Sequence, residues 1–92
     1  MEDPKEIAQK INSLKKKIEV DLVEISKHLE KLGKIMQQQQ NLPGSLRCKG
    51  FMRNTGAMLR GINNIRLSLV LPEVEESETE LLGIEEKIIE NA

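Results

Sequence analysis

Residues 4–40 read PKEIAQKINSLKKKIEVDLVEISKHLEKLGKIMQQQQ. Apolar side chains recur in this stretch at intervals of three and four residues, which is the spacing of an amphipathic helix and not the alternation of a strand. Such a narrow stripe is typical of coiled coils and helical bundles. We call it the predicted seam; it consists of Ile7, Ile11, Leu14, Ile18, Leu22, Ile25, Leu29, Leu32 and Met36.

The beginning of this helix is specified by its first residues. Asp3 can accept hydrogen bonds from the free amides of the first turn, Pro4 suits the first helical position, and Glu6 completes a capping-box pattern. At a rise of roughly 1.5 Å per residue, the stretch predicts a rod of about 55 Å. A helix of this length extends beyond the core of a small globular domain.

A turn is expected at residues 41–45, where Pro43 disfavours helix at Leu42 and Gly44 offers a position of positive φ. A second helical segment is expected over 46–71, with apolar positions that include Met58, Ile62, Ile65 and Leu69. Residues 65–71 also alternate as a strand would, and that alternative stays open. A short connection between two helices favours an antiparallel hairpin.

The chain has 92 residues, no Trp or Tyr, and Phe51 as its single aromatic residue. We therefore predict a single all-α domain over 1–92, built as a long N-terminal helix in an antiparallel helical hairpin or coiled coil. An acidic linker is expected at 72–80. The apolar residues of 81–90 predict a short amphipathic helix, which either docks as a third helix or remains free to recruit another protein.

Composition also bears on the compartment and on chemistry. A single cysteine, Cys48, excludes an intramolecular disulfide, and no stretch is apolar enough to span a bilayer. We expect an intracellular protein of the cytoplasm or nucleus. Because the chain has one His and one Cys, and its glutamates are dispersed, we predict no catalytic site, no metal site and no cofactor.

Charge is distributed unevenly along the sequence. Residues 73–92 contain eight glutamates and one lysine, whereas residues 41–72 contain no acidic residue. This asymmetry suggests an internal electrostatic match or two different partner surfaces. The candidate phosphate contacts in the acid-free segment are Arg47, Lys49, Arg53, Arg60 and Arg66.

These patterns favour a non-catalytic protein-protein interaction module. In this interpretation the chain is a small coiled-coil subunit that oligomerises with itself or assembles with other helical proteins in a multi-protein complex. One alternative is a nucleic-acid-binding protein that uses residues 41–72, with the acidic tail regulating access. Another is a small chaperone or adaptor that recruits a partner through residues 81–90.

Overall fold

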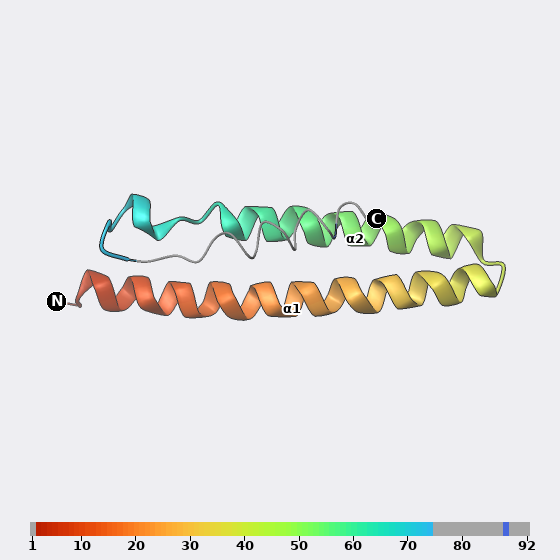
Figure 1. The fold of residues 1–92 in the computed structure, drawn as a ribbon, viewed down its shortest axis with the longest axis horizontal. Helices are drawn as coiled ribbons and strands as arrows, with labels where there is room; N and C mark the ends of the chain where they lie inside the picture. The colour runs from red at the N-terminus through yellow and green to blue at the C-terminus, as the bar shows by residue number, and fades with distance from the viewer. Residues whose placement is uncertain (1, 75–87, 89–92) are drawn as a thin grey trace.

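The fold is an all-α helical hairpin, described by a computed structural model for residues 2–74 and 88. Helix α1 spans Pro4–Gln38 and helix α2 spans Leu42–Asn63, and the two pack side by side in antiparallel directions (Figure 1). A short 3₁₀ turn, η1, follows at Leu67–Leu69. The molecule is elongated, with principal extents of 58 × 22 × 15 Å. The predicted helical hairpin is confirmed.

Helix α1 begins where the sequence predicts. Asp3 has extended backbone angles, and its carboxylate accepts a hydrogen bond of 3.1 Å from the backbone N–H of Lys5. Pro4 occupies the first turn, where its missing N–H would have no helical partner. Asp3 therefore acts as the predicted N-cap. The helix ends at Gln38, two residues before the end of the quoted stretch.

The connection between the helices is shorter than predicted and lies slightly earlier in the chain. Helix α2 already begins at Leu42, because Pro43 is accommodated in its first turn and does not interrupt it. Asn41 caps α2, and its side-chain oxygen accepts a hydrogen bond of 3.0 Å from the N–H of Gly44. The positive φ expected at Gly44 instead occurs at Gln40, where φ is 60°. The chain thus reverses its direction over three residues, 39–41.

Helix α2 ends at Asn63, so the prediction of a helix continuing to about Leu71 is wrong. The strand alternative for 65–71 is also wrong, because this segment contains the 3₁₀ turn η1. Asn63 and Asn64 explain the early end, since asparagine is a weak helix former that favours caps and turns. The predicted helix 81–90 lies outside the described residues except for residue 88, and of the predicted linker 72–80 only residues 72–74 are described.

Contact between the helices follows a heptad pattern of buried and half-buried residues, which we call the internal seam. Its spacing of three and four residues matches that of a coiled coil. On α1 it comprises Ala8, Asn12, Lys15, Glu19, Leu22, Ser26, Leu29, Gly33 and Met36. On α2 it comprises Ser45, Cys48, Met52, Thr55, Leu59 and Ile62.

The internal seam differs from the predicted seam by one residue at six of nine positions. Leu22 is buried and Leu29 and Met36 are half-buried, so these three belong to both seams. The predicted seam therefore contributes three of its nine residues to the contact with α2. The remaining six residues directly precede an internal-seam residue and are exposed; they are Ile7, Ile11, Leu14, Ile18, Ile25 and Leu32.

Small side chains explain why the helices meet along the less apolar stripe. Near the turn, Gly33 faces Cys48, and a Cβ atom added to Gly33 would lie 3.3 Å from the Cβ of Cys48. Close packing of this kind lets two helix backbones approach each other with few voids. Further along, Leu22 and Leu59 pack with Ile88 in the hydrophobic core. The hairpin therefore has a narrow core of its own.

Candidate functional site

The most distinctive surface of the hairpin is a row of exposed apolar side chains along α1. Among the seven that precede internal-seam residues, exposure ranges from 37% at Ile11 to 62% at Leu14. Two large side chains of α2, Phe51 and Met58, also precede internal-seam residues and are exposed. We call this set the apolar face; it consists of Ile7, Ile11, Leu14, Ile18, Ile25, Leu32, Ile35, Phe51 and Met58.

Both parts of the apolar face lie on the same side of the hairpin. Each residue of a right-handed helix is rotated by about 100° from the one before it. Because α1 and α2 run in opposite directions, residues that directly precede the internal seam turn toward the same side in both helices. The α1 row and the α2 pair are therefore neighbours, and together they form one two-helix surface.

Two titratable residues interrupt the apolar row on α1. Asp21 directly precedes Leu22, and His28 directly precedes Leu29, so both share the helical position of the apolar residues around them. Both side chains are exposed. His28 is thus an exposed helix residue. A helix that packs along this row must therefore place side chains opposite the carboxylate of Asp21 and the imidazole of His28.

The candidate phosphate contacts do not gather at one place. Lys49, Arg53 and Arg60 each directly follow an internal-seam residue, which places them on the side of the hairpin opposite the apolar face. Arg47 instead precedes Cys48 and belongs to the side of the apolar face. Arg66 lies beyond α2, at the N-cap of η1. The structure therefore brings together three of the five predicted cations.

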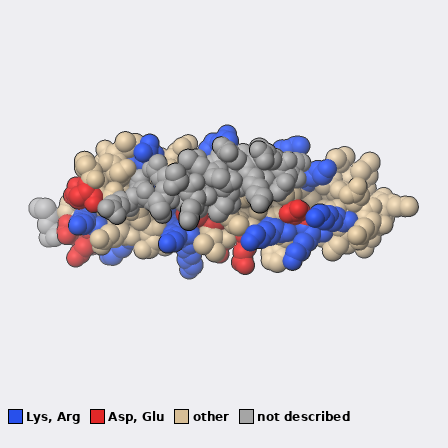
Figure 2. All heavy atoms as spheres, viewed as in Figure 1, with Lys and Arg blue, Asp and Glu red and all other residues tan. Residues whose placement is uncertain are grey.

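Helix α1 adds cations to the same side as Lys49, Arg53 and Arg60. Lys16, Lys27 and Lys34 each directly follow an internal-seam residue of α1. An exposed ion pair of 3.4 Å joins Lys34 to Glu30. Figure 2 shows Lys and Arg side chains above and below the grey atoms, with some Asp and Glu side chains among them. The hairpin thus has an apolar side and a side rich in cations.

One carboxylate lies within the contact between the helices. Glu19 belongs to the internal seam and is buried. Burial raises the pKa of its carboxyl group, because the charged form loses hydration, while the nearby ammonium groups of Lys15 and Lys16 partly counteract this rise. Lys15 also donates a hydrogen bond to the backbone carbonyl of Ile65, linking α1 to the segment after α2. Glu19 is therefore a pH-sensitive element of the fold.

The single thiol has a packing role in this structure. Cys48 is a free cysteine, buried in the internal seam opposite Gly33. Its neighbours in sequence, Arg47 and Lys49, lie on opposite sides of the hairpin. Among the described residues, no group of three or more His, Cys, Asp or Glu side chains is arranged to hold a metal ion. The described acidic and sulfur-containing residues thus bring no metal-ligating set together.

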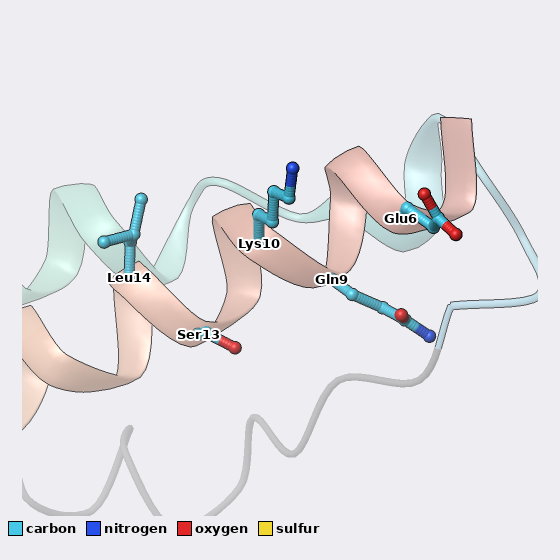
Figure 3. Close-up of a pocket in the computed structure, with 5 residues that line it drawn as sticks. All are labelled: Glu6, Gln9, Lys10, Ser13 and Leu14. Carbon is cyan, nitrogen blue, oxygen red and sulfur yellow. The ribbon is translucent and has the colours of Figure 1, made fainter. Parts of the chain in front are cut away.

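An open depression lies near the beginning of α1. The described residues that line it are Glu6, Gln9, Lys10, Ser13 and Leu14 (Figure 3). All five are carried by α1, and four of them have charged or polar side chains. Small-molecule sites are usually enclosed clefts lined mainly by hydrophobic side chains. A shallow site on one helix does not enclose a ligand in this way, so it does not compete with the apolar face as the candidate site.

Sequence reasoning identified six of the seven α1 residues of the apolar face, all except Ile35, but it did not separate the positions that contact α2 from those that are exposed. It missed six internal-seam positions of α1, because alanine, asparagine, lysine, glutamate, serine and glycine do not stand out in an apolar pattern. The internal seam could have been recognised from its small residues Ala8, Ser26 and Gly33. They are separated by multiples of about three and a half residues, as positions on one face of a coiled-coil helix are.

Comparison with known proteins gives no relative: no family model, curated protein or solved structure matches this chain. In the part of the chain that the structure describes, neither helix has a segment apolar enough to cross a membrane. The functional argument therefore rests on the surfaces of the hairpin itself.

Proposed function

We propose that this protein is a non-catalytic helical subunit that assembles, with itself or with other helical proteins, through the apolar face. The observation that carries this proposal is the exposure of the heptad-spaced Ile and Leu row of α1 beside Phe51 and Met58. Large contiguous apolar patches on small proteins are typical of interaction sites. An intracellular location accords with the free thiol of Cys48.

The heptad spacing specifies the type of contact. Side chains at alternating intervals of three and four residues fit into the spaces of a facing helix over many turns. From Ile7 to Leu32 the row extends over about 38 Å at the usual rise per residue. A contact of this length favours stable assembly over a brief encounter.

The test compares the mass of the native assembly for two matched variants. In Ile18→Asp/Ile25→Asp, charges enter the apolar face without touching the internal seam. The control is Val20→Asp, because Val20 is 57% exposed but lies outside the apolar face. Leu22 is unsuitable for this test, since it belongs to the hairpin's own core.

We expect wild-type protein and the Val20 control to elute from native extract in a particle well above the 10.4 kDa of one chain. The double variant should elute at the monomer mass with an unchanged circular dichroism spectrum. Purified protein, measured by light scattering, separates self-association from association with other chains. Monomeric wild-type protein in both preparations would contradict the proposal.

Nucleic-acid binding is a second candidate, favoured by the gathering of Lys49, Arg53 and Arg60 with the α1 lysines on one side. Contacts to phosphates make affinity fall steeply with salt. We expect, under this candidate, a salt-sensitive gel shift that is lost in Lys49→Ala/Arg53→Ala/Arg60→Ala and retained in Arg47→Ala. Equal loss in both variants would argue against a site on that side.

A further inference from the structure

The occupant of the apolar face can be specified further from the charges at its edge. This inference rests on the proposed function, because it takes assembly through the apolar face as given. We propose that the apolar face binds one amphipathic helix of a different protein, whose Leu or Ile stripe is bordered by Asp and Glu. Together the three helices would form a bundle.

The edge of the apolar face on α1 is mainly basic. Lys10, Lys17 and Lys31 each directly precede an apolar-face residue and are exposed. These three lysines belong to a seven-residue repeat at positions 10, 17, 24 and 31, in which Glu24 occupies the remaining position. These residues recur every seven positions, as do the flanking charges that select partners in coiled coils. Three cations and one anion thus border the row.

The edge of the apolar face on α2 is also positively charged. Arg47 is exposed and lies on the side of the apolar face, four residues before Phe51. A helix seated on the apolar face therefore has lysines along one flank and an arginine near the turn on the other. Carboxylates on both flanks of that helix would be attracted, and ammonium groups would be repelled.

A second copy of this chain matches the surface less well. Contacts between two copies about a two-fold axis use the same patch twice, so the lysine-rich edge of α1 would meet either its own copy or the α2 edge with Arg47. Parallel pairing of two α1 helices in register would also bring Asp21 against Asp21. A different chain with acidic flanks avoids both costs. The charge pattern therefore favours a heteromeric contact.

The experiment uses two synthetic peptide probes and the full-length protein. Each peptide has four heptads, about 28 residues, with Leu at the core positions a and d. The acidic peptide has Glu at both flanking positions, and the basic peptide has Lys there. Binding is followed by fluorescence anisotropy of the labelled peptide at low and at high salt.

We expect wild-type protein to bind the acidic peptide at least about tenfold more tightly than the basic one, a difference of roughly 1.4 kcal/mol. Added salt should reduce this preference, because it screens exposed charges. Lys10→Glu/Lys17→Glu/Lys31→Glu should reverse the preference. Ile18→Asp/Ile25→Asp should abolish binding of both peptides, and Val20→Asp should leave it unchanged.

Two results would overturn this inference and separate it from the proposed function. Equal or tighter binding of the basic peptide by wild-type protein would show that the flanking lysines do not select the partner. A concentration-dependent homodimer that binds neither peptide would keep the apolar face as an assembly surface but identify a second copy as its occupant. A monomer that binds neither peptide would overturn this inference, whereas the proposed function fails only if the protein is also monomeric in native extract.

Discussion

Gly33 of α1 and Cys48 of α2 face each other so closely that a methyl group on Gly33 would lie 3.3 Å from the Cβ atom of Cys48. This separation is tighter than ordinary van der Waals contact between carbon atoms. The pair lies near the turn, where the three-residue connection holds the helix ends together. Glycine at position 33 is therefore favoured by packing, although it lowers the helix propensity of α1.

This relationship predicts different effects for two glycine-to-alanine substitutions. Gly50→Ala should increase the free energy of unfolding by about 0.8–1 kcal/mol, because it raises helix propensity and a Cβ atom there meets nothing within 4 Å. Gly33→Ala should stabilise the hairpin less, or destabilise it, because Cys48 must move. Urea unfolding followed by circular dichroism measures both. Equal stabilisation would show that the helices can separate freely at this point.

The turn supplies a second prediction. Gln40 has a φ of 60°, a conformation that costs a residue with a side chain about 1–2 kcal/mol. Gln40→Gly should remove this strain and, after the entropy cost of glycine, stabilise the hairpin by about 0.5 kcal/mol. Gln39→Gly is the matched control, because φ at Gln39 is −81°. The control should be less stable than wild type. The opposite order of the two variants in thermal unfolding would contradict this account of the turn.

Truncation to alanine at two adjacent residues of α2 should change the free energy of unfolding by very different amounts. Leu59 is 0% exposed and packs in the core with Leu22 and Ile88, whereas Met58 is 58% exposed on the apolar face. Leu59→Ala should lower the free energy of unfolding of the monomer by about 2–5 kcal/mol. Met58→Ala should change it by no more than about 0.5 kcal/mol. Comparable losses in chemical denaturation would show that the internal seam is misassigned.

Glu19 makes stability depend on pH. Because burial raises the pKa of this carboxyl group in the folded state, the folded protein holds its proton more tightly than the unfolded chain. This contribution to stability is fully present below the unfolded pKa and is lost as the pH rises through the folded pKa. At neutral pH the ionised carboxylate is therefore unfavourable for folding.

Glu19→Gln should accordingly be more stable than wild type at pH 7, and its advantage should shrink as the pH falls through the raised pKa of Glu19 and be absent below the ordinary pKa of glutamate. Glu24→Gln is the control, since Glu24 is exposed on α1. Melting temperatures measured across the acidic range provide the test. If the advantage of Glu19→Gln persists unchanged at low pH, this linkage is ruled out.

Periodicity and capping were enough to predict the two helices and their antiparallel arrangement. The intervals of three and four residues from Ile7 to Met36 define a helix, and Asp3 marks its beginning. The boundaries near Pro43 and Asn63 were less predictable. Proline ends helices but is also accepted in their first turn, so the residue alone does not distinguish the two roles.

The orientation of α1 could not be read from its apolar pattern. Periodicity finds the most apolar stripe of a helix, but it does not say which stripe contacts the neighbouring helix. Here that contact is made by small residues such as Ser26 and Gly33, because their small side chains allow the backbones of α1 and α2 to approach each other closely. The role of the apolar stripe as a surface for association, and the partner that would bind it, stay predictions.

The outward orientation of the Ile and Leu row also bears on protein turnover. A folded monomer with this row exposed resembles the unassembled subunits that chaperones and proteases act upon. A partner present at about 100 times its dissociation constant would add about 2.7 kcal/mol to the stability of the hairpin. Copies produced in excess of the partner would lack that protection and be degraded, so the cellular level of this chain would follow the level of its partner.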